Sequence, residues 1–354
     1  MDIRPCRHRR LFSRHRPHSS PSDTLALMET SRFAAVRPLR IVIPGGSGQI
    51  GRVLARHFQR RGDQVIVLTR GPHTAEWQTV HWDGQTPGLW TQYLDGADVC
   101  INLTGRSVNC RYTPDNRVEI YNSRIASTRL LGQVIASLAN PPRVWLNAST
   151  ATIYRHALDH SMDEKTGELG NRDPRVPDTW NFSTRVARDW ETAFFKAETP
   201  KTRKVAMRSA ITFSPTPGNA FSVLSHLVRI GLGGKQGNGR QWVSWIHEDD
   251  LARAVEFLIT REDLDGPVNI ASPNPEQNRE FMAILRESWN MPNGIPAPAP
   301  LLEIAAFFLR TETELVLKSR RVIPTRLLNA GFTFNIPNWA HAAEDLVEKW
   351  RRRT

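Results

Sequence analysis

Glycines recur at every third position in one short stretch of the chain, as Gly45, Gly48 and Gly51. A β-branched run precedes them and an amphipathic run follows, so the pattern predicts strand, glycine loop and helix. The first glycine permits a turn with positive φ, the second lets backbone amides approach a phosphate, and the third lets the helix pack closely on the sheet. A pyrophosphate would lie at the helix N-terminus, where free N–H groups favour an anion. We therefore predict a dinucleotide site that includes Gln49 and Ile50; the alternative is a glycine-rich turn that only reverses the chain.

The residues at the end of the second predicted strand, 64–69, indicate which dinucleotide would bind. In NAD-selective folds this strand ends in Asp or Glu, which accepts a hydrogen bond from the ribose 2′-OH. Here it ends in Thr69 and Arg70. A carboxylate would repel a 2′-phosphate, whereas arginine offers it a charge-assisted contact. We therefore expect NADP(H) rather than NAD(H), contacted by Thr69 and Arg70. The alternative is that Arg70 is a solvated turn residue.

Alternating strands and helices would position these residues. Thr113 followed by Pro114 predicts the start of a long helix that ends before 140–142, and a second helix is expected over about 181–198. Such alternation implies an α/β fold of the Rossmann type, with a doubly wound, mainly parallel sheet. Apolar runs predict its strands at about 39–43, 64–69, 79–82, 98–103, 143–149, 204–213 and 267–270.

Three parts of the chain are expected. Residues 1–38 would be a disordered extension, because they are rich in Arg, His, Ser and Pro and lack a periodic apolar pattern. Residues 39–275 would form the NADP-binding Rossmann domain, with substrate-domain insertions at about 214–245. Residues 276–354 would form a small, mainly helical domain that closes over the nicotinamide end as a lid. Within it, Leu327, Leu328, Phe332 and Phe334 would mostly form the small domain's own core.

Several runs together resemble the short-chain dehydrogenase/reductase superfamily in its atypical or extended form, and more narrowly its NAD-dependent epimerase/dehydratase type. The resemblance covers about 39–350 and implies the fold and the cofactor better than the reaction. It also implies cofactor contacts from Leu103, Thr104, Arg124 and Arg208. Arg124 could instead pair with Glu119 or Glu76. The matching runs are Gly45–Gly51, Asn102–Gly105, Ser123–Arg124, Arg188–Glu191, Trp245–Ala254 and Arg321–Phe334.

The superfamily catalyses with a Ser or Thr, a Tyr, and a Lys four residues after the Tyr. The resemblance implies that Ser149 polarises a substrate oxygen and that Tyr154 exchanges its proton, while hydride passes between the nicotinamide and a carbinol carbon. Leu158 stands where the Lys is expected. A tyrosine without a nearby cation keeps a pKa of about 10 and is poorly suited to acid–base work. The alternative is that Tyr154 lines the pocket and Ser149 caps the strand.

His247 is a second candidate acid or base, because it lies in a run of tryptophans and aspartates at 242–250. We expect instead that Asp249 or Asp250 caps the following helix and that His247 packs at its start. Arg208, on a strand predicted to be buried, needs an anion or a carbonyl group as its partner.

Composition excludes several classes of protein. The chain has 354 residues and a net charge of +12, which fits anionic ligands or simply a basic surface. Aromatic and basic residues do not alternate as in nucleic-acid sites, and no run approaches the ~18 apolar residues of a membrane helix. Neither a nucleic acid nor a membrane is therefore expected as a partner. Cys6, Cys100 and Cys110 are unpatterned, so we expect no metal site, a reducing compartment and a cytoplasmic location.

The N-terminal extension has two further interpretations. Its Arg- and Ser-rich composition is compatible with a transit peptide. The favoured interpretation is that translation starts at Met28, which leaves residues 1–27 dispensable.

The function expected from these observations is that of an NADP(H)-dependent oxidoreductase or epimerase-like protein. Its substrate would be a small carbonyl or hydroxyl compound, with sugars among the candidates, and the chain would act as a monomer or homodimer. The alternative is a non-catalytic NADP(H)-binding regulator or assembly factor.

Overall fold

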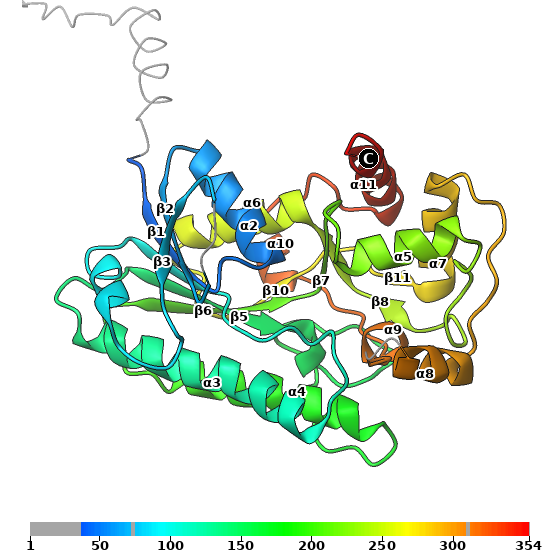
Figure 1. Ribbon diagram of the computed structural model, residues 1–354, viewed down its shortest axis with the longest axis horizontal. Helices are drawn as coiled ribbons and strands as arrows, with labels where there is room; N and C mark the ends of the chain where they lie inside the picture. Colours follow the sequence, from blue (N-terminus) through cyan, green and yellow to red (C-terminus); the bar gives the residue numbers. More distant parts are fainter. Residues whose placement is uncertain (1–36, 72–74, 309–311, 354) are drawn as a thin grey trace, which may run out of the picture. The chain divides into compact units, whose positions relative to one another are not determined.

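Seven parallel strands form the central sheet, in the order β10-β6-β5-β4-β1-β2-β3 (Figure 1). The computed structural model describes residues 37–71, 75–308 and 312–353, and Leu39–Thr354 form one compact unit. This strand order is the doubly wound one, reversing between β1 and β4, so the predicted Rossmann-type fold is confirmed. The strands are β1 (Arg40–Pro44), β2 (Gln64–Thr69), β3 (Gln78–His81), β4 (Val99–Asn102), β5 (Val144–Thr150), β6 (Arg203–Ser209) and β10 (Gly266–Ile270). The predicted extension lies outside the described residues, apart from Arg37 and Pro38.

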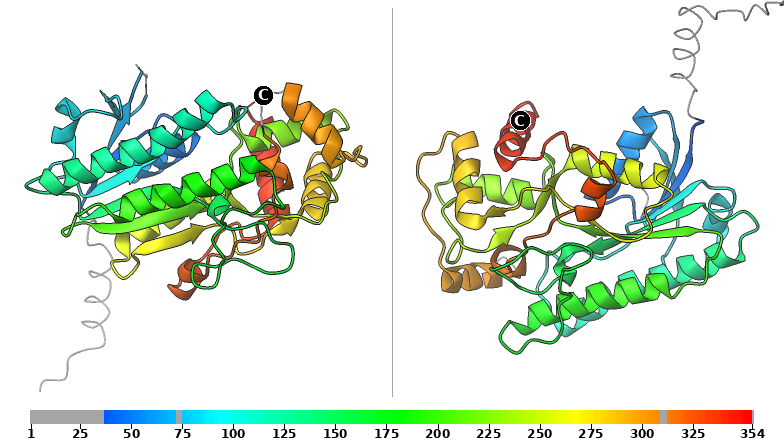
Figure 2. Two further views of the ribbon diagram at one scale, coloured as in Figure 1. Left: turned by 90° about the horizontal axis from the view of Figure 1, so that it is seen from below. Right: turned by 180° about the vertical axis from the view of Figure 1, so that it is seen from behind.

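Helices cover both faces of the sheet. On one face lie α2 (Gln49–Arg60) and α6 (Glu248–Thr260), and on the other lie α3 (Pro114–Ser137) and α4 (Asp178–Phe195) (Figure 1). The latter two helices lie side by side (Figure 2). As predicted, Thr113 caps α3, because its side chain accepts a hydrogen bond from the Asn116 amide and Pro114 occupies the first turn.

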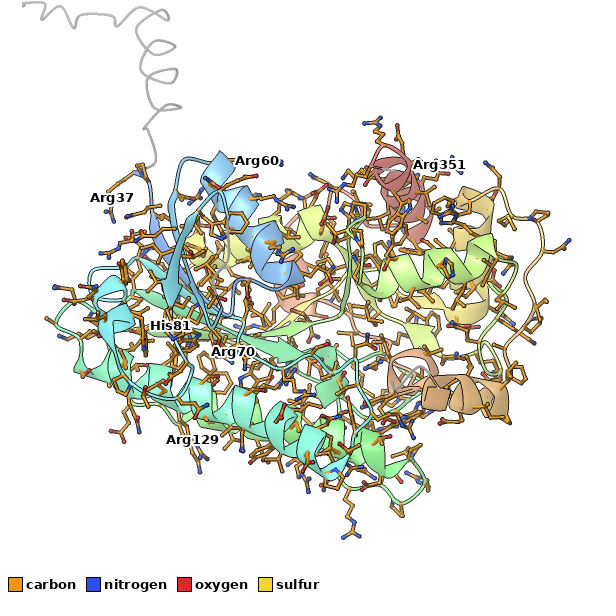
Figure 3. All side chains as sticks on the ribbon, viewed as in Figure 1. Arg37, Arg60, Arg70, His81, Arg129 and Arg351 are labelled. Atoms are coloured by element: carbon orange, nitrogen blue, oxygen red, sulfur yellow. The ribbon has the colours of Figure 1, made fainter. Side chains whose placement is uncertain are left out.

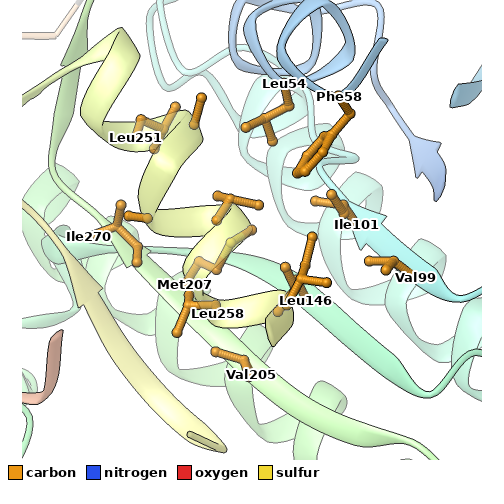
Figure 4. Packing of buried hydrophobic residues seen from close by; sticks show 14 of the residues in the cluster. Leu54, Phe58, Val99, Ile101, Leu146, Val205, Met207, Leu251, Leu258 and Ile270 are labelled. Atoms are coloured by element: carbon orange, nitrogen blue, oxygen red, sulfur yellow. The ribbon is translucent and has the colours of Figure 1, made fainter. Parts of the chain in front are cut away.

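Apart from the edge strand β3, the strands of the main sheet are largely buried on both faces, which explains their nearly continuous apolar sequences. Successive side chains alternate between the two faces. In β5, Trp145 contacts Phe194 of α4, whereas Leu146 belongs to the cluster beneath α2 and α6. Figure 4 shows that second cluster, in which Leu54 and Leu258 approach the sheet from the two helices.

The predicted strand 204–213 is wrong in one respect, because the chain leaves the main sheet at Ala210. The Ala210 amide still donates to Ile270 O of the main sheet, but the next amide, that of Ile211, donates to Ser244 O. Residues Ile211–Phe213 therefore form β7, which pairs with β9 (Trp245–His247) in a second sheet. A third small sheet joins β8 (Trp242–Val243) to β11 (Glu276–Gln277).

Aromatic side chains form the core beside the second sheet. The rings of Phe281 and Trp339 stack with their centroids 4.0 Å apart, and Phe213 and Trp245 contact the same tryptophan. This aromatic core is enclosed by α5 (Ala220–Arg229), α7 (Asn278–Ser288) and α11 (Trp339–Arg351).

The last segment of the chain returns to the main sheet. Leu327, Phe332 and Phe334 pack in the same cluster as Leu54 and Phe58 of α2. The expectation that they belong to a separate small core is therefore wrong for these three residues. The remaining helices are α8 (Ala299–Phe308), α9 (Glu314–Leu317) and α10 (Thr325–Asn329), with short 3₁₀ turns η2 (Leu89–Tyr93) and η3 (Ala151–Ile153). Within the described part of the chain, no helix is long and apolar enough to cross a membrane.

Candidate functional site

The glycine loop joins β1 to α2 at the point where the strand order reverses. Gly45 has a φ of +74°, and a Cβ there would lie 2.7 Å from Thr104 Cα of the β4 turn. A Cβ on Gly51 would lie 2.3 Å from Gly46 O. Both positions therefore exclude side chains, one by conformation and contact and the other by contact alone.

Gly48 differs from the other two glycines, because nothing in the protein crowds it. It is the N-cap residue of α2, and the nearest atom to a Cβ built on it is Gly45 O at 3.9 Å. No side chain caps this helix, so the first amides, those of Gln49 and Ile50 among them, are available to an anion. The Gln49 side chain donates to Thr212 O at 3.4 Å, and Ile50 packs against the core.

Beside this loop, the β4 turn carries a buried polar atom without a partner. Thr104 Oγ1 is inaccessible to solvent and makes no hydrogen bond with any residue in the described part of the chain, while the Thr104 amide donates to Asn102 Oδ1 at 3.1 Å. Leu103, the preceding residue, packs against the core under α2. A free helix N-terminus, an uncrowded glycine and an unpaired hydroxyl together fit a dinucleotide that supplies the missing contacts.

Arg70 lies at the carboxyl end of β2 (labelled in Figure 3). Thr69 is buried, whereas Arg70 is exposed. Among the described residues, no hydrogen bond or ion pair engages the Arg70 guanidinium, and residues 72–74 lie outside the description. The side chain that sequence reasoning assigned to a 2′-phosphate is thus accessible to one.

The two hydroxyls expected to be catalytic lie in one buried network instead of at an open surface. Ser149 is 6% exposed, and its Oγ donates to Glu191 Oε1 of α4 at 2.6 Å. Tyr154 is 0% exposed, and its hydroxyl donates to Asn269 Oδ1 at 2.9 Å. Arg208 connects the two, because it forms a bidentate pair with Glu191 and donates to the Tyr154 hydroxyl at 3.0 Å.

This network changes two expectations. The expectation that Tyr154 has no cation nearby is wrong, because the guanidinium of Arg208 on β6 donates to the Tyr154 hydroxyl. Burial nevertheless keeps the pKa of Tyr154 above its usual value, although Arg208 acts in the opposite direction. Arg208 has the anionic partner that burial requires, in Glu191 rather than in a cofactor phosphate. As arranged here, neither hydroxyl is free to meet a substrate.

Thr150, which sequence reasoning did not single out, is the hydroxyl residue left partly exposed at the end of β5. Its Oγ1 accepts a hydrogen bond from the Thr152 amide at 3.1 Å. Because strand residues alternate, consecutive hydroxyl residues at a strand end must face opposite sides. This alternation is the signal by which Thr150 could have been found from the sequence. Ser149 faces α4, and Thr150 therefore faces the other side of the sheet.

Arg124 of α3 lies against the turn that follows β4. Its guanidinium donates to the carbonyls of Ile120 and Arg106, and it stacks over the Trp190 ring at 5.3 Å. The alternative considered for Arg124, an ion pair with Glu119, is not formed, because Glu119 pairs with Arg106. Neither Glu119 nor Glu76 is its partner among the described residues.

His247 is a structural residue at the start of α6. It is fully buried, its Nδ1 accepts from the Asp249 amide at 3.2 Å, and its Nε2 lies 3.0 Å from Asp345 Oδ2. The histidine itself therefore caps the helix, and the expectation of an aspartate cap is wrong. Asp250 is buried and accepts from the Asn335 and Ile336 amides instead.

A second polar group, also missed from the sequence, lies where the C-terminal segment meets α4 and η3. It comprises Tyr112, Ser183, Glu314, Lys318 and Arg320. Lys318 and Arg320 are 3% and 7% exposed. Charged residues are seldom buried, so nothing in their spacing marked them in advance. In the described residues, no group of three or more His, Cys, Asp or Glu side chains is placed to hold a metal ion.

Comparison with known proteins finds matches over most of the chain. The model of the NAD dependent epimerase/dehydratase family matches residues 41–271, and a domain of unknown function, DUF1731, matches residues 297–346. An epimerase family protein of Staphylococcus haemolyticus is 30% identical over 309 residues, covering 87% of this chain and 99% of the relative.

Two solved structures extend the similarity. The human epimerase family protein SDR39U1 (isoform 2), solved with NADPH, is 26% identical with a TM-score of 0.75, covering 87% of this chain and 99% of that chain. A nucleoside-diphosphate sugar epimerase from Corynebacterium glutamicum is 28% identical with a TM-score of 0.69, covering 92% of this chain and 62% of that one. The resemblance seen in the sequence is confirmed: the chain belongs to the NAD dependent epimerase/dehydratase family.

Proposed function

We propose that this chain binds NADP(H) in preference to NAD(H) and uses it in oxidoreductase or epimerase chemistry on a small carbonyl or hydroxyl compound. One observation carries the cofactor preference. Arg70, exposed and without a partner in the described structure, stands at the end of β2, where an NAD-selective site has a carboxylate. The human relative solved with NADPH supports the same preference.

The residues of this chain would divide the binding between them. The N-terminus of α2 would hold the pyrophosphate through the amides that follow Gly48, and Arg70 would pair with the 2′-phosphate. Thr104 Oγ1 would gain the partner it lacks. The bound nicotinamide supplies a hydride acceptor or donor, and Thr150 is the accessible hydroxyl that can orient a substrate oxygen at the strand ends.

A second function is favoured by the burial of Ser149 and Tyr154. If their network with Glu191 and Arg208 persists in the bound state, the chain is a non-catalytic NADP(H)-binding regulator or assembly factor. Oxidation of NADPH in the presence of a library of small carbonyl compounds discriminates the two. Turnover with any member supports the enzyme, and no turnover by protein that binds NADPH tightly supports the regulator.

The preference for NADP(H) is tested by Arg70→Asp, with the matched change Arg129→Asp on exposed α3 as control (both arginines are labelled in Figure 3). Loss of a hydrogen bond to a charged group costs about 1.5–3 kcal/mol, so calorimetry should show NADPH binding weakened by about 10- to 150-fold and NADH binding little changed. Arg129→Asp should bind both as the natural chain does. Equal affinities for NADPH and NADH in the unaltered protein would contradict the proposal.

A further inference from the structure

Three cationic side chains, those of Arg124, Lys318 and Arg320, lie near the carboxyl ends of β4 and β5. Arg124 packs against the turn after β4, where a Cβ on Gly105 would lie 3.1 Å from its Cζ. Arg320 donates to Thr152 Oγ1 at 2.6 Å, and Lys318 donates to Thr152 O at 2.9 Å. Thr152 lies in η3, directly after β5. In doubly wound sheets, ligands bind beyond these strand ends.

Arg124 has neutral partners only. The two carbonyls that it contacts and the Trp190 ring satisfy its N–H groups and its face, but they contribute no full negative charge. Burial lowers the pKa of Arg124 to about 10, and the groups that oppose this effect are Tyr112 and Cys110, neither of them a carboxylate. The guanidinium is thus a charge held in the protein without an acidic counterpart.

Among the described residues, Lys318 contacts one carboxylate, that of Glu314, and Arg320 contacts none. Glu314 Oε1 lies 3.2 Å from Lys318 Nζ, while Glu314 Oε2 accepts from Ser183 Oγ at 2.5 Å. Arg320 makes its other bonds to the carbonyls of Glu314 and Leu315. Burial lowers the pKa of Lys318 to about 8 despite Glu314, and it lowers the pKa of Arg320 as well.

The other charged or titratable groups nearby do not neutralise the excess positive charge. Glu312 is paired with Arg111 and adds no net charge. His156 accepts from the Ser319 amide through Nδ1, and its pKa is lowered by burial and then by Lys318 and Arg320. Among the residues that the structure describes, the cluster of Arg124, Lys318, Arg320 and Glu314 is therefore left with three cations and one carboxylate.

A hydroxyl lies between the two parts of this cluster. Ser183 Oγ is 3.4 Å from the Tyr112 hydroxyl, and both residues are partly exposed. Burial raises the pKa of Tyr112 to about 12, with Glu314 and Arg124 both close enough to influence it. Because unpaired buried charge is costly, an excess of cations beside the partly exposed hydroxyls of Tyr112 and Ser183 favours the binding of an anion there.

We propose that the cluster of Arg124, Lys318, Arg320, Tyr112 and Ser183 binds the oxyanion, carboxylate or phosphate, of an anionic substrate beside the nicotinamide end of the site. The proposal rests on the proposed function, because it names the substrate class of that same site. Arginine suits either oxyanion through its planar donors. Anionic hydroxy or carbonyl compounds, such as sugar acids and sugar phosphates, are then preferred over neutral ones.

Calorimetric titration with glucuronate, glucose 6-phosphate and neutral glucose, at constant ionic strength, tests this class. Each probe is titrated into the protein with and without saturating NADPH. We expect at least one anionic probe to bind 10-fold or more tightly than glucose, and the carboxylate and phosphate arms identify which oxyanion is preferred. Equal binding of all three would overturn the proposal. Failure of NADPH to bind would instead refute the proposed function.

Substitutions of single lysines test which residue causes the preference for anionic probes. Lys318→Met should remove the preference for the anionic probe, whereas Lys204→Met should retain it. Lys204 is the control, because it is a half-buried lysine that donates to two carbonyls, those of Phe195 and Ala197, at the opposite end of β6. Lys318→Gln is the second variant if Lys318→Met does not fold. An unchanged preference in a folded Lys318 variant would overturn the assignment.

Proton uptake gives a readout that a merely structural lysine would not move. A bound anion stabilises the charged form of Lys318, so binding at about pH 8.5 should take up protons. Titration in two buffers of different ionisation enthalpy measures this uptake. It should be present in the natural chain and in Lys204→Met and absent in Lys318→Met; uptake that persists in Lys318→Met would count against the proposal.

Discussion

At the scale of single residues, the three glycines of the loop have different structural roles. Gly51 is crowded by Gly46, whereas a Cβ on Gly48 would touch nothing closer than 3.9 Å. Gly51→Ala should therefore destabilise the fold, by about 1–3 kcal/mol as for other overpacked sites. Gly48→Ala should melt within a few degrees of the natural chain and yet bind NADPH about tenfold or more weakly, because the new methyl group occupies the path of the phosphates.

Thermal melting and calorimetry on the two variants measure these effects separately. If Gly48→Ala binds NADPH as tightly as the natural chain does, the pyrophosphate does not lie at the N-terminus of α2. If Gly51→Ala melts normally, the close approach to Gly46 is relieved by a small movement of the loop.

The candidate site was only partly predictable from its residues. The glycines and Arg70 were found because their signal is local: spacing along the chain and position at a strand end. Tyr154 was assigned by resemblance to a catalytic motif, but its environment depends on Arg208 and Asn269, which the fold brings from β6 and β10. Lys318 and Arg320 could not be found at all, because their burial depends on packing between segments far apart in sequence.

At the scale of elements, α11 is attached to the start of α6 by a charged contact. Asp345 Oδ2 lies 3.0 Å from His247 Nε2 and 2.9 Å from Lys349 Nζ, and its side chain is 33% exposed. The hydrogen bond with His247 holds the pKa of Asp345 at about 2, with Lys349 acting in the same direction. A carboxyl group whose pKa is lowered by folding stabilises the fold at pH values above its pKa in the unfolded chain, which is near 4. This stability is lost as the pH falls towards 2.

Asp345→Asn should accordingly lower the free energy of unfolding at pH 7 by about 1 kcal/mol, a figure reduced for solvent screening of a partly exposed pair. The difference from the natural chain should shrink at pH 3. Urea denaturation at the two pH values measures both effects. Glu348→Gln on the same helix, whose exposed partner is Arg352, is the control and should change little. A difference that does not depend on pH would mean that packing alone attaches α11.

The elements themselves were largely predictable, since apolar runs and helix caps are local. The strand 204–213 shows the limit of such local signals. Apolar residues occur on both sides of Ala210, so the sequence does not indicate that the chain leaves β10 there and pairs with the second sheet. The strand leaves the main sheet because the Ile211 amide donates to the carbonyl of Ser244, which is distant in sequence. The predicted cap of α6 was wrong for a similar reason. The position of the buried His247 side chain depends on its contact with Asp345 of the last helix.

At the scale of the whole molecule, the C-terminal segment contributes to the Rossmann core through Leu327, Phe332 and Phe334, besides its part in the aromatic core. A chain ending at Ile323 loses Leu327, Phe332 and Phe334 from the cluster under α2 and α6. Large core truncations cost about 2–5 kcal/mol each, which together approaches the whole stability of an ordinary domain. We expect this chain to show no cooperative melting transition by circular dichroism and no NADPH binding.

A chain starting at Met28 is the matched truncation at the other end. It should keep the melting temperature and cofactor affinity of the full chain, since residues 1–27 have too little apolar content to pack. Cooperative melting of the chain that ends at Ile323 would show that 39–323 folds alone. A drop of several degrees for the chain that starts at Met28 would show that the extension contributes to the fold.

The presence of Phe332 and Phe334 in the same core cluster as Leu54 and Phe58 also bears on how the protein is made. A ribosome adds about 5–20 residues per second, so α2 emerges on the order of tens of seconds before the phenylalanines that complete its cluster. During that interval the nascent chain presents an incomplete apolar surface to chaperones and proteases. Truncated products that end before Phe334 share this defect permanently, so cellular quality control should remove them, and full-length chains should make up nearly all of the protein that accumulates.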